Sequence, residues 1–293
     1  QELLRSGFTL TNKDYPGYNK QIEESIGSEN SLAIRLSKRT IMAIEVDDIR
    51  KARPALQLIS IALDTALRKK EFEYINELAR KVERSLLPKE EDLRSIQKNY
   101  DVAWHAKAAK VVGGDYLRFR PMDDKSTAIM IGDAKGKGIS ASIVAQSTHI
   151  ALESLTSHNL RAAALMDTIN KTLYKTEITK EPMTLFYCTL TQHGAISYVN
   201  AGHPYPILFH DSYVEKLHTG GIMLGPLEDS KYSHDVAKMR TGDLLFLYTD
   251  GLSEAVNQRG EEIGIKRLEE IVGGYKTHSS EEIKEYLIKE SRK

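Results

Sequence analysis

The sequence predicts an α+β layered sandwich, and the order of its elements carries this prediction. Strand-like runs alternate with loops from Tyr100 to Ala134, two helix-like stretches follow, and strand-like runs then return. Strands first, helices next and strands again argue against a regular βαβ repeat. A short pair of strands and a long helical stretch come earlier in the chain. We therefore expect a small α/β amino-terminal segment and a linker helix before the main domain.

Within the main domain, the two predicted helices run from about Ile139 to Leu155 and from Leu160 to Tyr174. The strands that follow are rich in β-branched and aromatic residues and are separated by turn residues. These strands are Met183–Leu190, Ala195–Val199, Pro206–Phe209 and Leu244–Tyr248.

The amino-terminal part predicts a β-hairpin followed by a long helix. Two short apolar runs, Leu32–Leu36 and Ile41–Ile44, flank a polar connection. From Pro54, which can open a helix, the apolar residues take helical spacing, and Pro88 ends the pattern. The apolar stripe is Leu56, Ile59, Leu63, Leu67, Ile75, Leu78, Val82 and Leu86. The other face is charged, so the helix lies on its own domain or pairs with a second subunit; we favour a homodimer.

Composition excludes several classes of protein. Hydrophobic residues make up 41% and charged residues 28%, as in an ordinary soluble protein. Acidic and basic residues number 41 each, so no net field draws the chain to nucleic acid or an anionic membrane. No apolar run approaches the ~18 residues of a transmembrane helix. The single cysteine, Cys188, can form neither an internal disulfide nor a zinc site, which fits a cytoplasmic location.

Three aspartates stand where a predicted strand meets glycine: Asp115, Asp133 and Asp250. Glycine lets the backbone turn sharply and approach a ligand closely. Each motif alone is more typical of a turn that ends a strand, but the three together favour a common site. Carboxylates without cysteine or a histidine cluster suit Mg²⁺ or Mn²⁺ better than zinc. Two such ions could clamp a phosphoryl group and activate a water molecule.

Four runs of sequence make the hypothesis more specific. They are Ala109–Tyr116, Ile131–Ser142, Asn200–Pro204 and Tyr248–Ala255. In this order they resemble the signature blocks of the SpoIIE/RsbU branch of metal-dependent (type 2C, PPM) serine/threonine protein phosphatases. The resemblance spans roughly Leu86 to Leu268. It implies an α-β-β-α sandwich that hydrolyses phosphoserine or phosphothreonine on a small anti-sigma-factor antagonist (STAS) protein.

The resemblance also implies roles for individual residues. Asp133 would bridge two Mn²⁺ or Mg²⁺ ions, with the carbonyl of Ala134 as a further ligand. Asp115 would complete the shell of one ion and Asp250 would hold the other. Lys135 and Lys137 follow the second motif and could attract a phosphopeptide, or they could be solvated loop charges. His203 could face the cleft, although its motif is more simply a turn that orders a loop.

The resemblance suggests three parts: a partial GAF-type sensor or dimerisation segment (1–65), a linker helix (66–90) and a phosphatase domain (91–293). Members of the family close with an Asp-Asp pair before a last strand, whereas this chain stops at Glu290–Lys293. We therefore expect the domain to lack its final strand, and we favour an incomplete sequence over a natural loss. The alternative function is a catalytically weak module that binds a phosphoprotein. A small-molecule phosphatase is disfavoured because no nucleotide or sugar pocket is recognisable.

Overall fold

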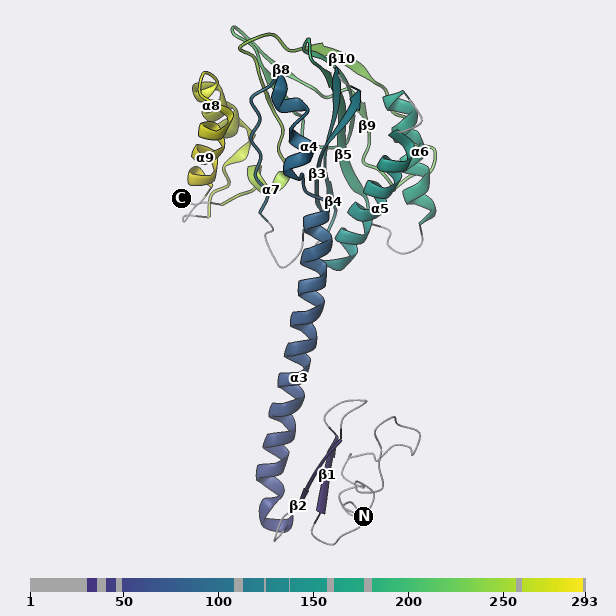
Figure 1. Ribbon diagram of the computed structural model, residues 1–293, viewed down its shortest axis with the longest axis vertical. Coiled ribbons are helices and arrows are strands. Elements are labelled where there is room, and N and C mark those ends of the chain that lie inside the picture. Colours follow the sequence, from purple (N-terminus) through teal and green to yellow (C-terminus); the bar gives the residue numbers. More distant parts are fainter. Residues whose placement is uncertain are drawn as a thin grey trace. The chain divides into compact units, whose positions relative to one another are not determined.

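The computed structural model describes residues 31–35, 41–45, 49–107, 113–123, 125–136, 138–156, 161–176, 181–256 and 260–291 (Figure 1). Its contacts divide the chain into two units, Gln1–Glu77 and Leu78–Lys293. The boundaries expected after residues 65 and 90 stay predictions. Within the described residues, no helix combines the length and the apolar character needed to cross a membrane.

The amino-terminal unit contains the predicted hairpin. Strands β1 (Ser31–Arg35) and β2 (Ile41–Glu45) pair antiparallel, with Ala33 opposite Ala43. The expected connection between the two strands lies outside the described residues.

Helix α3 (Ile49–Ser85) is 37 residues long and runs through the division between the units. It begins five residues before Pro54, so the prediction that Pro54 opens the helix is wrong. Pro54 lies in the second turn, where it has no N–H to donate to the carbonyl of Arg50. The helix ends three residues before Pro88, as predicted. Two short helical turns follow, α4 (Glu90–Leu93) and η1 (Ile96–Lys98).

The main sheet has the strand order β10-β6-β5-β4-β3, and every neighbouring pair along this path is antiparallel. A short strand, β9, pairs parallel with β6. The strands are β3 (Asp115–Asp123), β4 (Ser126–Ala134), β5 (Met183–Thr191), β6 (Ala195–Ala201), β9 (Gly220–Gly221) and β10 (Asp235–Lys238).

A small sheet of order β11-β7-β8 is formed by β7 (Ile207–Phe209), β8 (Val214–Lys216) and β11 (Leu244–Phe246). The helices of the domain are α5 (Ile139–Thr156), α6 (Ala162–Lys175), α7 (Asp250–Ser253), α8 (Gly264–Tyr275) and α9 (Ser280–Glu290). The start of α9 is well defined, because Ser279 and Glu282 form a reciprocal capping box.

Side-chain alternation sorts these elements into four layers. In β4, Ala128 and Met130 join the core beneath α5 and α6, whereas Ile129 and Ile131 join the core between the two sheets. In the small sheet, Leu208 belongs to the inter-sheet core, and its neighbours in β7 pack with α8 and α9. Figure 1 shows α5 and α6 on one side of the strands and α8 and α9 on the other. The predicted α-β-β-α sandwich is thus confirmed.

Candidate metal centre

Asp115 and Asp133 are brought together by the pairing of β3 with β4. They are direct register partners, and Asp133 is in turn the partner of Thr184 in β5. Partners in antiparallel strands project their side chains to the same face of a sheet. The three residues therefore form one row across three adjacent strands.

This row continues the inter-sheet core of the sandwich. The two preceding rows on the same face are wholly apolar or thiol: Phe119, Ile129 and Cys188, then Leu117, Ile131 and Phe186. At the next row the side chains become two carboxylates and a hydroxyl. The apolar layer between the sheets therefore ends at a cluster of oxygen atoms.

Two glycines bring the backbone close to this cluster. A Cβ atom on Gly114 would lie 2.5 Å from the carbonyl oxygen of Ala134, and one on Gly132 would lie 2.5 Å from that of Thr184. The amide of Ala134 also donates to the carbonyl of Gly114, at 3.2 Å. Only glycine permits these approaches, so the glycine signals in the sequence report backbone packing around the carboxylate row.

The loop after Asp133 is fixed at both ends. The amide of Lys135 donates to the carbonyl of Pro182 at 2.8 Å, and the Lys135 side chain is exposed. At the start of α5, the buried Ser142 hydroxyl lies 3.1 Å from the carbonyls of both Gly113 and Gly138. Ser142 therefore ties α5 to the backbone that precedes Asp115. The candidate Lys137 lies outside the described residues.

Asp250 follows β11, a strand of the small sheet. It is exposed, and it opens the short helix α7 after Thr249 and the buried Tyr248, which packs with α8 and α9. Within the described part of the chain, no group of three or more His, Cys, Asp or Glu side chains is placed to hold a metal ion. The meeting of Asp250 with Asp115 and Asp133 therefore stays a prediction. The donors that the structure does place together, two carboxylates beside a close backbone carbonyl, are of the kind that suits a hard cation.

His203 is buried rather than facing the cleft, with 2% of its surface exposed. The Asn200 side chain accepts from the His203 amide at 2.7 Å and donates to the His203 carbonyl at 3.0 Å. The interpretation of this motif as an ordering turn is thus confirmed. Burial lowers the pKa of His203 to about 4, and the backbone of Tyr248 acts weakly in the opposite direction. The imidazole is therefore neutral at physiological pH.

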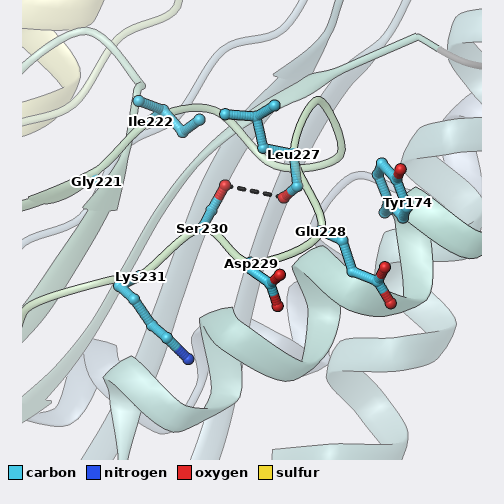
Figure 2. Close-up of a pocket in the computed structure, with 8 residues that line it drawn as sticks. All are labelled: Tyr174, Gly221, Ile222, Leu227, Glu228, Asp229, Ser230 and Lys231. Atoms are coloured by element: carbon cyan, nitrogen blue, oxygen red, sulfur yellow. Dashed lines mark hydrogen bonds between the residues drawn. The ribbon is translucent and has the colours of Figure 1, made fainter.

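A separate pocket of about 620 Å³ lies between α6 and the loop that follows β9, lined by Tyr174, Gly221, Ile222 and Leu227–Lys231 (Figure 2). The buried Asn170 side chain holds this loop, because it donates to the carbonyls of Leu227 and Glu228 and accepts from the amide of Gly225. None of the predicted site residues lines the pocket.

Comparison with known proteins identifies the family. The family model of Stage II sporulation protein E (SpoIIE) matches residues 123–293, which is more than half of the chain. The chain belongs to the SpoIIE family. The predicted resemblance is thereby confirmed at the level of the family.

Two solved structures resemble this SpoIIE-family chain in fold. The match to the SiaA-PP2C domain of Pseudomonas aeruginosa includes 77% of this chain and 91% of that domain. Its TM-score is 0.66 and the sequence identity is 17%. The second structure is the PP2C phosphatase domain of SpoIIE from Bacillus subtilis with a fragment of its regulatory domain. The match includes 61% of this chain and 52% of that one, with a TM-score of 0.51 and 20% identity.

A relative in sequence is phosphoserine phosphatase RsbU of Bacillus subtilis (strain 168). It is 27% identical over 192 residues, which are 63% of this chain and 55% of RsbU. This SpoIIE-family chain thus spans about half the length of that relative.

Two participants in the site were not among the residues singled out from sequence. Thr184 and Ser142 are ordinary strand and helix residues in the sequence, and only strand register and the position of α5 bring them to the aspartates. The one available signal for Ser142 was its place at the end of the motif Ile131–Ser142.

Proposed function

We propose that this chain is a metal-dependent phosphatase for phosphoserine or phosphothreonine in proteins. The observation that carries the proposal is the Asp115–Asp133 pair, which ends the inter-sheet core of a SpoIIE-family fold. Paired carboxylates at a rigid strand end are suited to hold hard cations against a phosphate. The relative RsbU of Bacillus subtilis, a phosphoserine phosphatase, supports the same activity.

In this proposal Asp133 would be a ligand of both metal ions, Mn²⁺ or Mg²⁺, and the carbonyl of Ala134 would be a further ligand. Asp115 serves one ion and Asp250 the other. The ions supply Lewis-acid activation of the phosphoryl group and of the attacking water. The chain itself holds Asp115 and Asp133 at strand ends, and Lys135, which is exposed and follows Asp133 by two residues, would attract the phosphopeptide.

The proposed substrate is a phosphorylated regulatory protein of the STAS type, in a cytoplasmic pathway that controls a sigma factor. The family resemblance supports this choice. Within the described part of the domain, the carboxylate row stands at the end of a layer and not inside the pocket of Figure 2, which suits a substrate presented on the surface of another protein.

The test is Mn²⁺-dependent dephosphorylation of a phosphorylated STAS protein by the parent chain and two variants. Asp133→Asn should lower kcat/KM by at least 100-fold because it removes the bridging carboxylate. Asp123→Asn is the matched control: it changes the same charge at the other end of β3, where the side chain accepts from Ser126 and the amide of Lys125. Equal rates for all three proteins, or an inert parent, would overturn the proposal.

The second candidate is a phosphoprotein-binding module without useful catalysis. It is favoured by the lack of a three-residue metal-ligand group in the described part of the chain. Binding of the phosphorylated STAS protein that is equally tight with Mn²⁺ and with a chelator, and without release of phosphate, would support this module against the enzyme.

We further propose that the chain forms a homodimer through α3. Three residues of the predicted apolar stripe, Leu67, Ile75 and Leu78, are 37%, 40% and 53% exposed. Pairing with a second copy of the helix would cover them. Sedimentation of the parent should give a dimer, and Ile75→Lys should give a monomer; a monomeric parent would contradict the proposal.

A further inference from the structure

His203 lies at a fixed point between the two sheets. The N–H and the C=O of His203 are both hydrogen-bonded to the side chain of Asn200. The Asn200 side-chain amide also donates to the carbonyl of Leu217 at 3.3 Å. The preceding Gly202 has φ of 66°, and a Cβ there would lie 2.7 Å from the amide nitrogen of Met223. The backbone therefore leaves the imidazole little freedom of position.

One nitrogen of the ring contacts the row that contains the aspartates. The Thr184 hydroxyl lies 3.0 Å from His203 Nδ1 and 3.2 Å from the carbonyl oxygen of Asp133. A hydroxyl has one proton, and a carbonyl can only accept. The single Thr184 proton can go to the Asp133 carbonyl or to Nδ1, so the direction of the bond between Thr184 and His203 follows the tautomer of the ring.

The other side of the ring is turned to the segment that carries Asp250. Nε2 is buried, and within the described residues no hydrogen-bond partner lies at hydrogen-bonding distance and angle. The backbone of Tyr248 favours the protonated imidazole, as a carbonyl oxygen that faces a ring N–H does. Tyr248 belongs to the core of the small sheet and stands two residues before Asp250. A single side chain thus touches the Asp133 strand through Thr184 and borders the Asp250 segment.

We infer that His203 is a positioning residue that fixes the Asp250 segment relative to the Asp115–Asp133 row. The chain of contacts runs from the Asp133 carbonyl through the Thr184 hydroxyl and the imidazole to the backbone of Tyr248. It joins β4 and β5 of the main sheet to the segment that follows β11 of the small sheet. This inference rests on the proposed metal-dependent function.

The competing explanation is that the buried imidazole of His203 only fills space in the core. This explanation accounts poorly for the contacts, because a residue that only fills space would need neither the bond to Thr184 nor the bond between Thr184 and the Asp133 carbonyl. Replacing a residue that orients a metal ligand, but does not itself contact the metal, typically weakens metal affinity 10- to 100-fold.

The experiment compares His203→Gln with His210→Gln. His210 is a matched control because it is also buried, but its partners are Asp243 at 2.8 Å and Glu215 at 3.3 Å, outside the aspartate row. Mn²⁺ affinity is measured by isothermal titration calorimetry on the full chain. His203→Gln should weaken binding by about 10- to 100-fold, and His210→Gln should leave it unchanged. Hydrogen exchange of the metal-free chain should rise at Tyr248–Gly251 in His203→Gln alone.

Thr184 supplies a second pair of variants should His203→Gln fail to fold. Thr184→Val removes the hydroxyl and should reproduce the loss of Mn²⁺ affinity, whereas Thr184→Ser keeps the hydroxyl and should restore most of it. The KM for a phosphorylated substrate at saturating Mn²⁺ should change by less than about threefold, because the substrate does not touch His203.

The outcomes separate this inference from the proposed function. A parent that binds Mn²⁺ and hydrolyses phosphoserine, with His203→Gln and Thr184→Val binding the ion equally well, would overturn the positioning role alone. A parent that neither binds Mn²⁺ nor hydrolyses phosphoserine would overturn both.

Discussion

Asp115 and Asp133 face each other across β3 and β4 as direct register partners. Like charges directly opposite one another on a sheet destabilise it, typically by 0.2–1 kcal/mol. The same geometry concentrates the negative charge that a divalent cation would neutralise. The fold therefore accepts a small electrostatic cost at the proposed centre, and this cost can be measured.

We expect Asp133→Asn to raise the stability of the metal-free chain by about 0.2–1 kcal/mol, because it removes the repulsion from Asp115. Added Mn²⁺ should raise the melting temperature of the parent but not of Asp133→Asn. Thermal unfolding with and without Mn²⁺ measures both effects. Asp123→Asn, at the other end of β3, should behave as the parent does; a similar Mn²⁺ response in all three proteins would argue against the ion site.

We expect Gly114→Ala to destabilise the chain by about 1–3 kcal/mol, because the added methyl group would press on the Ala134 carbonyl. The matched control is Gly274→Ala in α8, where a Cβ would meet nothing within 4 Å. That change should stabilise the helix by up to ~1 kcal/mol. Urea unfolding of both variants checks the opposite signs, and a neutral Gly114→Ala would show that the close approach is not required.

We expect Leu86→Ala to cost about 2–5 kcal/mol, because Leu86 is fully buried in the core beneath α5 and α6. Its carbonyl also accepts from the amide of Leu117 in β3, at 3.2 Å. Ile150 in α5 is 58% exposed, so Ile150→Ala should change stability by less than about 0.5 kcal/mol. Chemical unfolding followed by circular dichroism compares the two, and equal costs would place Leu86 outside the core.

We expect His203 to make stability depend on pH in the acid range. Its pKa falls from 6.5 when unfolded to about 4 when folded, because burial disfavours the charged ring. Between these values the unfolded chain binds a proton that the folded chain does not. The contribution is therefore complete above pH 6.5 and is lost as the pH falls toward 4.

Between pH 7.5 and 5.0 this effect should cost the parent about 2 kcal/mol. Urea unfolding at the two pH values measures it, and His203→Gln should show a loss smaller by that amount. Identical pH dependence in both proteins would mean that the ring is protonated without cost in the folded state.

Much of the fold could be predicted because its signals are local. Helices α5 and α6 and the strands β5, β6, β7 and β11 were placed to within about three residues from periodicity and turn residues. The short strands β8, β9 and β10 were missed, since they have two to four residues, many of them exposed, and show no apolar alternation. Their pairing depends on neighbours that only the folded sheet provides.

The sequence by itself determined the apolar residues on both faces of β4 and β5 and the glycines that bring the backbone close to Asp115 and Asp133. These properties follow from side-chain alternation and from the missing Cβ, which act within a few residues. Only the tertiary structure decided that Thr184 bonds Asp133 and that His203 reaches both Thr184 and the Tyr248 backbone. Those contacts join residues far apart in the chain, so they are set by strand register and by the packing of one sheet on the other.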